Sequence, residues 1–281
     1  MTTSSHPPAA SAAAAFDQSH QGRMRSAAVE QIYQAAFGQD YPASAHPSAF
    51  YSATTLQLAV NTLQLSPGNV VADLGCGHGG SGLWAARQTG ASLIGIDLSP
   101  AGIELARRQA TQLGLDGQAR FQVGDLTATG LPDASCDAVI SLDVLLFVPD
   151  KAAAAREITR ILRPGGRLAF TTWERLAHPA GDDPHRLALA STFRDHPLLQ
   201  SARTDYRQLI QNAGLTVEAY QEPPGWRPQQ QALADGIIAA EAEITADMGR
   251  HYTAMARVFL ADLPNLRYIL IAARRPAHKD H

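Results

Sequence analysis

From Val70 onward, short apolar runs alternate with amphipathic segments. The apolar run that begins at Val70 and the run Ser92–Asp97 have the length of buried strands. Later segments carry apolar residues at helical spacing; they cover residues 81–88, 99–114, 150–163 and 205–213. Strands that alternate with helices predict an α/β fold built on a parallel, doubly wound sheet.

Two segments outside this alternation are also helical in pattern. Residues 24–37 and 52–65 repeat apolar side chains on one face, and residues 228–262 interrupt the last two predicted strands. We therefore expect N-terminal helices and a helical lid insertion. The predicted units are a disordered tail 1–22, a helical cap 23–66, a core 67–175, an acceptor-pocket segment 176–200, the rest of the core sheet 201–275 with its insertion at 228–262, and a tail 276–281.

Composition narrows the class of protein. The chain has 281 residues and a net charge of −3 without a basic run, so we expect a small-molecule partner and no nucleic acid. Cys76 and Cys136 are far apart, which favours a reducing compartment and a cytoplasmic location. We expect no membrane span, because no apolar run approaches roughly 18 uncharged residues. A homodimer is compatible with the sequence, although nothing requires one.

The candidate chemistry starts in a glycine-rich turn. Asp73 ends the first strand, and Gly75, Gly77 and Gly79 follow it before the helix that begins near Ser81. Glycines allow a sharp bend and a close approach of a ligand to the backbone. The segment also satisfies the dinucleotide motif Gly-x-Gly-x-x-Gly through Gly80, so an NAD(P)-dependent oxidoreductase is an alternative.

The charge of Asp73 decides between these cofactors. A dinucleotide places its pyrophosphate at the helix N-terminus, where a neighbouring carboxylate would repel it. A cofactor with an ammonium and a sulfonium would instead be attracted. Asp97 ends the second strand about 20 residues beyond the glycines, the offset at which a carboxylate accepts from a ribose diol. These features favour S-adenosylmethionine.

The segment around Asp73 resembles the first motif of the class I S-adenosylmethionine-dependent methyltransferases. The resemblance continues at 121–126, 136–147 and 161–173, which look like the third, fourth and fifth strands of that family, and 266–273 looks like its antiparallel seventh strand. It implies a seven-stranded, Rossmann-like, mostly parallel sheet. The cofactor-binding residues that we expect are Asp73, Gly75, Gly77, Gly79, Asp97, Leu98, Asp125, Leu126, Ser141 and the loop residue Tyr41.

The resemblance is closest to methyltransferases that act on quinones, sterols and natural products. The fourth strand ends in Ser141-Leu-Asp-Val144 and not in the Asn/Asp-Pro-Pro-Tyr of amine and amide methyltransferases, so oxygen or carbon is favoured as the acceptor atom. A second alternative keeps the cofactor but uses the pocket for a cyclisation or isomerisation without methyl transfer. Residues expected to contact the acceptor are Phe147, Trp173, Tyr33, Phe37 and Trp226, although Tyr33 and Phe37 also have the spacing of ordinary core residues.

A general base cannot be chosen from the sequence alone. The candidates are His178, His185 and His196, with His178 preferred because it follows Trp173 closely. Asp182 and Asp183 with two of these histidines could form a metal site, but polar loops often have this composition, and we expect no metal. His78 lies inside the glycine loop, where we interpret it as a residue of an exposed turn and not as a catalyst.

Overall fold

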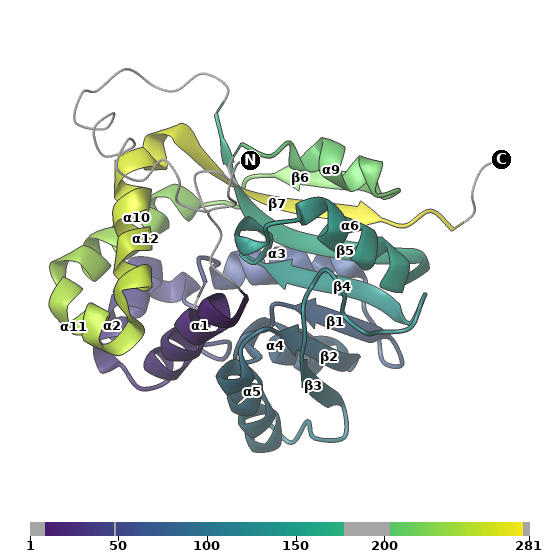
Figure 1. Ribbon diagram of the computed structural model, residues 1–281, viewed down its shortest axis with the longest axis horizontal. Helices are drawn as coiled ribbons and strands as arrows, with labels where there is room; N and C mark the ends of the chain where they lie inside the picture. The colour runs from purple at the N-terminus through teal and green to yellow at the C-terminus, as the bar shows by residue number, and fades with distance from the viewer. Residues whose placement is uncertain (1–8, 48, 177–202, 278–281) are drawn as a thin grey trace.

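The computed structural model describes residues 9–47, 49–176 and 203–277, and a seven-stranded sheet forms its centre. The strand order is β3-β2-β1-β4-β5-β7-β6, and only β7 runs antiparallel to its neighbours (Figure 1). The predicted doubly wound, mostly parallel sheet is therefore confirmed. Its strands are β1 (Val70–Leu74), β2 (Ser92–Asp97), β3 (Ala119–Val123), β4 (Cys136–Leu142), β5 (Leu162–Arg175), β6 (Thr216–Gln221) and β7 (Leu266–Arg274).

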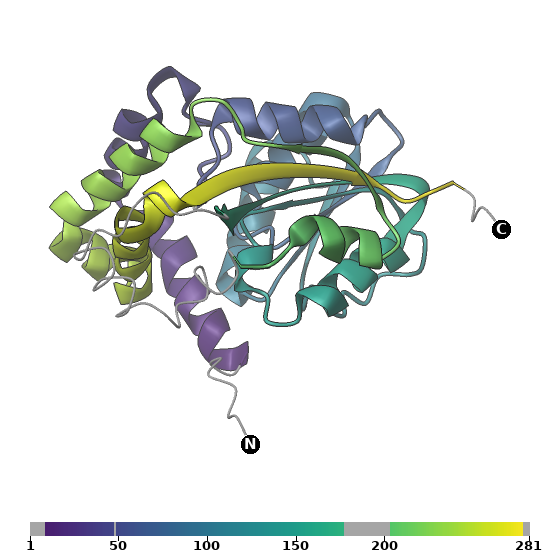
Figure 2. The same ribbon diagram turned by 90° about the horizontal axis from the view of Figure 1, so that it is seen from above.

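Helices cover both faces of the sheet, so that an apolar layer lies on each side of it (Figure 2). One layer contains α3 (Ala53–Leu63), α4 (Gly80–Thr89) and α5 (Pro100–Gln112). The other contains α6 (Lys151–Ile161) and α9 (Tyr206–Asn212). Because both faces are buried, the central strands are apolar without alternation, which is why they appeared as continuous runs in the sequence.

The helix boundaries follow from capping side chains. Ser99 Oγ accepts from the backbone N–H of Gly102 at 2.9 Å, and Pro100 occupies the first turn of α5. Asp150 and Asp205 cap α6 and α9 in the same way. Each cap satisfies backbone donors that have no partner inside the helix. Helices α5 and α6 thus begin next to residues 99 and 150, where the sequence pattern placed their starts.

The remaining helices form a cap at the carboxyl ends of the parallel strands (Figures 1 and 2). The antiparallel strand β7 follows the last cap helices in the chain and therefore starts at this end of the sheet. The cap consists of α1 (Ala9–Arg23), α2 (Ala27–Phe37), α10 (Trp226–Ala239), α11 (Glu241–Met248) and α12 (Arg250–Asp262). The short helices η1 (Gly38–Asp40), η2 (Leu145–Phe147) and η3 (Leu263–Asn265) lie in connections. The predicted insertion at 228–262 is helical as expected.

The predicted disordered tail over residues 1–22 is wrong from Ala9 onward. Residues from Ala9 belong to helix α1, which packs between α5 and α11. Gly22 permits the close packing, because a Cβ there would lie 2.1 Å from the carbonyl oxygen of Asp247. Among the described residues, no helix is both long and apolar enough to cross a bilayer.

Candidate functional site

The glycine loop connects β1 to α4 and has three residues in the left-handed region. Gly75, Gly77 and Gly79 have φ values of +78°, +52° and +90°, which side chains disfavour. The backbone N–H of Gly75 donates to the carbonyl of Ile96 at 2.7 Å, which ties the loop to the end of β2. A Cβ on Gly75 would lie 2.4 Å from the Val144 side chain, so the loop also lies against the segment after β4.

Asp73 lies beneath this loop and is fully buried. Its Oδ2 accepts from Ser81 Oγ at 2.8 Å, and the backbone N–H of Gly82 hydrogen-bonds the same carboxylate. Its Oδ1 is buried and has no partner among the described residues. Burial raises the pKa of Asp73 to about 7, and these hydrogen bonds offset only part of that increase. One carboxylate oxygen thus remains open to a positively charged group.

Asp97 stands at the end of β2 and is 8% exposed. Its Oδ2 accepts from the backbone N–H of Gly77, and its Oδ1 accepts from that of Ser99, both at 2.8 Å. The acid expected to bind a ribose therefore touches the glycine loop directly. Leu98 beside it is half-buried.

The other predicted cofactor residues lie on neighbouring strand ends. Asp125, after β3, is exposed and accepts from the N–H and Oγ1 of Thr127 at 2.7 Å, while Leu126 is buried. Ser141, on β4, is buried and donates to the carbonyl of Leu74 at 2.7 Å. The predicted loop and strand-end residues thus converge on one edge of the sheet, as expected for a doubly wound fold.

Helix α1 lies over the glycine loop. A Cβ on Gly77 would lie 2.6 Å from Cε1 of His20, and the His20 ring meets the His78 ring edge-on with 5.7 Å between centroids. Phe16, one turn earlier, makes an edge contact with Phe147 at 5.5 Å. His78 is only 4% exposed, so the interpretation of His78 as a residue of an exposed turn is wrong. The covering helix α1, which the sequence did not reveal, is the reason.

Asp143, directly after β4, joins three segments that are distant in sequence. Its Oδ2 accepts from the backbone N–H of Phe50 at 2.8 Å and from the Tyr268 hydroxyl at 3.0 Å. Its Oδ1 accepts from Thr171 Oγ1 at 2.9 Å. Burial raises the pKa of Asp143 to about 6, and the three hydrogen bonds oppose that increase. Asp143 therefore fixes the loop that enters α3 to the strand ends.

Replacing Asp143 should be costly, because three buried donors would lose their acceptor. We expect Asp143→Ala to lower the free energy of unfolding by about 2 to 4 kcal/mol, measured by urea denaturation. The matched control is Asp235→Ala on the exposed side of α10, where the change should stay within about 0.5 kcal/mol. Equal midpoints for the two variants would contradict the role assigned to Asp143.

Comparisons with known proteins decide the family. A model described as a methyltransferase domain matches residues 72–170. The 27-O-demethylrifamycin SV methyltransferase of Amycolatopsis mediterranei (strain S699) is 30% identical over 227 residues, which cover 76% of this chain and 80% of that protein. The chain belongs to the class I S-adenosylmethionine-dependent methyltransferases. The nicotinamide oxidoreductase is thereby set aside.

Two further similarities agree with this family. Methyltransferase GfsG of Streptomyces halstedii is 27% identical over 243 residues, covering 84% of each chain. The crystal structure of the [4+2]-cyclase SpnF shares the fold, with a TM-score of 0.66 and 23% identity over 79% of this chain and 81% of that one. The methyltransferase fold is therefore present in proteins whose names state different reactions.

The observed residues fit the methyltransferase cofactor, S-adenosylmethionine. The loop packs tightly against the side chains of Val144 at Gly75 and His20 at Gly77, so both positions require glycine. Asp73 Oδ1 is a buried acceptor without a partner, and Asp97 presents a carboxylate at the loop. The ligand's ammonium and ribose hydroxyls are donors of the kind that these acids require.

The aromatic residues expected to contact the acceptor divide into two groups. Trp173 is fully buried and packs against Phe50, Trp226 and Tyr268, with ring centroids 4.8 to 5.8 Å apart. Phe147 is only half-buried and lies beside the loop residue Val144. Phe147 thus remains the better placed of the predicted contacts.

Three N-terminal aromatic residues lie inside the cap. Tyr33 and Phe37 are buried and stacked with 5.9 Å between centroids, which is the core role left open by their spacing. Tyr41 donates to Glu30 Oε2 at 2.7 Å and accepts from Arg23 at 2.8 Å. Its hydroxyl is therefore engaged by cap residues in this structure, and contact with the cofactor stays a prediction.

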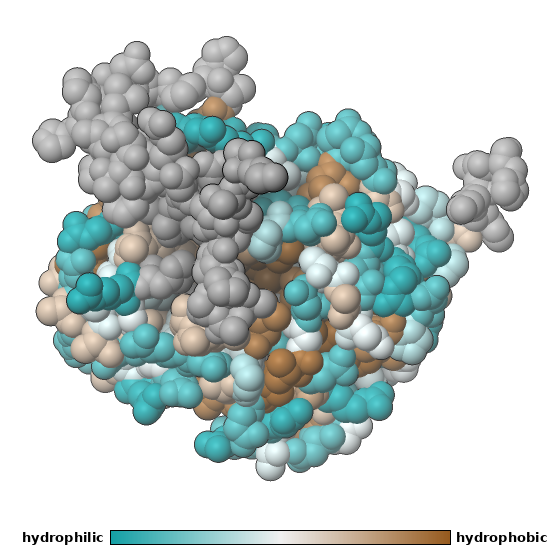
Figure 3. Space-filling model, in the orientation of Figure 1, coloured by the Kyte–Doolittle hydropathy of each residue, from teal (hydrophilic) through white to brown (hydrophobic). Residues whose placement is uncertain are grey.

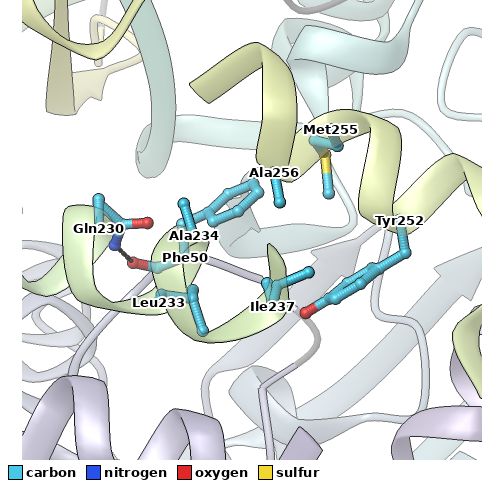
Figure 4. Close-up of a pocket in the computed structure, with 8 residues that line it drawn as sticks. All are labelled: Phe50, Gln230, Leu233, Ala234, Ile237, Tyr252, Met255 and Ala256. Atoms are coloured by element: carbon cyan, nitrogen blue, oxygen red, sulfur yellow. Dashed lines mark hydrogen bonds between the residues drawn. The ribbon is translucent and has the colours of Figure 1, made fainter. Parts of the chain in front are cut away.

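A small pocket lies between α10 and α12, next to Phe50 (Figure 4). Gln230 borders it while donating to the carbonyl of Phe50 at 2.6 Å. Apart from Gln230, the lining consists of aliphatic and aromatic residues: Phe50, Leu233, Ala234, Ile237, Tyr252, Met255 and Ala256. Its walls belong to the predicted cap and lid.

The base candidates His178, His185 and His196 lie outside the described residues, as do Asp182 and Asp183. Within the ranges that the structure describes, no group of three or more His, Cys, Asp or Glu side chains could hold a metal ion. The choice of a general base therefore stays a prediction.

Proposed function

We propose that this methyltransferase transfers a methyl group to an oxygen of a largely apolar natural product, with carbon as the second choice of acceptor atom. The observation that carries the proposal is the extent of similarity to the 27-O-demethylrifamycin SV methyltransferase. That similarity covers 227 residues, far more than the cofactor domain at 72–170, and so includes parts of the acceptor side.

Apolar surface on one face of the molecule and apolar side chains beside the glycine loop support an apolar acceptor. In the orientation of Figure 3, apolar surface is visible near the centre of the molecule, between more hydrophilic regions. Phe147 and Val144 are both half-buried next to the glycine loop. Apolar and aromatic walls with few polar groups are typical of small-molecule sites.

The protein's contribution to the reaction is mainly alignment. The bound cofactor supplies an already activated methyl group. The loop and Asp97 hold the cofactor, and the cap keeps water away while the acceptor oxygen is oriented. Orientation of this kind can contribute about 7 to 11 kcal/mol. The acceptor hydroxyl loses its proton to a base or to solvent, and a base adds roughly 10²- to 10⁴-fold.

The test uses S-adenosylmethionine with a deuterated methyl group and 27-O-demethylrifamycin SV as the probe acceptor, with a hydroquinone and a sterol for comparison. We expect a methylated product whose deuterium NMR signal is that of a methoxy group, together with one S-adenosylhomocysteine per product. Asp97→Ala, which should bind the cofactor far more weakly, serves as the control. A new carbon-bound methyl would move the proposal to carbon, whereas a converted acceptor without S-adenosylhomocysteine would favour cyclisation or isomerisation and overturn it.

A further inference from the structure

Two buried imidazoles lie against the glycine loop and have no role so far. His20 comes from α1 and is 9% exposed, and His78 comes from the loop itself and is 4% exposed. The Nδ1 atoms of both are buried without a hydrogen-bond partner among the described residues. Such atoms are rare in folded proteins, and each calls for an explanation.

The tautomer of His78 follows from its one hydrogen bond. Its Nε2 lies 2.7 Å from the carbonyl oxygen of His46, and a carbonyl oxygen can only accept, so Nε2 carries the proton. Burial lowers the pKa of His78 to about 3, so its ring is neutral. The Nδ1 atom is therefore a bare acceptor, and the missing partner must be a donor.

His20 is held in place over the same part of the loop. Its Nδ1 would be 3.2 Å from a Cβ on Gly77, the residue whose N–H binds Asp97. Asp17, on the same helix, accepts from Ser99 Oγ at 2.5 Å and from the N–H of Ala101 at 3.1 Å. These contacts anchor α1 at the start of α5, beside the acid expected to bind the ribose.

We propose that helix α1 completes the cofactor site and that His20 and His78 hydrogen-bond the polar groups of S-adenosylmethionine through their Nδ1 atoms. The ammonium and the ribose hydroxyls are the donors that His78 lacks. The acids Asp73 and Asp97 attract the charge and hold the diol, whereas the imidazoles add neutral contacts from the opposite side. The inference depends on the family's cofactor and not on the acceptor proposed above.

The test for His78 uses two variants that each keep a polar group near the position of one ring nitrogen. The probe is S-adenosylhomocysteine, and calorimetry measures its dissociation constant. His78→Gln retains a donor near the Nε2 position and loses the Nδ1 acceptor, so we expect the dissociation constant to rise roughly 3- to 10-fold while the thermal midpoint changes little. His78→Asn retains an acceptor near Nδ1 but loses the bond to His46. It should bind more tightly than His78→Gln and melt at a lower temperature.

The test for His20 compares His20→Leu with His20→Asn and with Gln21→Leu, an exposed neighbour on the same helix. We expect His20→Leu to weaken binding roughly 3- to 10-fold, His20→Asn to weaken it less, and Gln21→Leu to leave it unchanged. Tighter binding by His20→Leu would show that α1 obstructs the site, and unchanged binding by both His20→Leu and His78→Gln would also overturn the proposal. Because the probe binds without an acceptor, a failed methylation assay does not affect this result.

Discussion

Asp97→Ala should raise the dissociation constant for S-adenosylhomocysteine by roughly 100-fold or more. Hydrogen bonds to a charged group contribute about 1.5 to 3 kcal/mol each, and the ribose diol would lose two of them. The structure adds a second reason, because Asp97 also accepts from the N–H of Gly77 and the N–H of Ser99. Its removal would leave the N–H of Gly77 in the glycine loop without its acceptor. Calorimetric titration measures the effect.

Asp125→Ala is the matched control for this prediction. Asp125 is also an acid after a strand of the same edge, but it is exposed and its carboxylate is used by the neighbouring Thr127. The family resemblance implies that Asp125 accepts from the adenine amino group. A solvated contact of this kind is weaker, so we expect a change of less than about 10-fold. If Asp97→Ala bound the probe as tightly as the parent, the assignment of the ribose acid would be wrong.

The sheet and the acids at its edge were predictable because their signals are local. A strand end, a cap such as Ser99 and a glycine turn each occupy a few consecutive residues, and topology then brings the strand ends together. The sequence therefore places Asp73, Asp97 and Ser141 at one edge of the sheet. The glycine loop adopts the positive φ values that its composition implies.

Helix α1 could not be predicted, because its support comes from residues far along the chain. The segment around Phe16 is rich in alanine and serine and has no continuous apolar face, so its composition resembles that of a tail. Its contacts are with residues far along the chain, such as those of Asp17 at the start of α5, Phe16 on Phe147, His20 on the glycine loop and Gly22 on α11. The single signal in the sequence is the spacing of Phe16 and His20, which places both on one helical face.

The role of Asp143 was hidden for the same reason. Its partners Phe50, Thr171 and Tyr268 come from three elements, and no short motif connects them. Trp173 was expected to contact the acceptor because it ends a strand near the site. It is fully buried against Phe50, Trp226 and Tyr268, and its contact with the acceptor stays a prediction. Tertiary contacts between elements that are distant in sequence therefore decide both cases.

The affinity for S-adenosylmethionine should depend on pH through Asp73. Without the cofactor, burial raises the pKa of Asp73 to about 7, so the carboxyl is largely protonated below that pH. A raised pKa in the folded state means that the folded protein binds the proton more tightly than the unfolded chain. This group therefore lowers the stability of the cofactor-free protein as the pH rises from about 4 to about 7.

Cofactor binding lowers the pKa of Asp73 again, because the ammonium and the sulfonium favour the ionised carboxylate. Cofactor binding must then release a proton below pH 7, and we expect the dissociation constant to rise by up to about 10-fold for each pH unit below 7. Above pH 8 the affinity should fall again, since an α-amino group loses its proton with a pKa of about 8. Calorimetry between pH 5 and about pH 9 measures the profile.

Asp73→Asn separates this mechanism from a general effect of acid. The amide cannot ionise, so the variant should bind the cofactor weakly, and its dissociation constant should not change with pH below pH 7. Above pH 8 the dissociation constant should also change less than in the parent, because the ammonium no longer has a carboxylate to attract it. The parent should lose more affinity for S-adenosylmethionine than for S-adenosylhomocysteine on acidification if the sulfonium contributes beside the shared ammonium. A parent profile as flat as that of Asp73→Asn would show that Asp73 does not face the cofactor's charge, and its buried Oδ1 would need another partner.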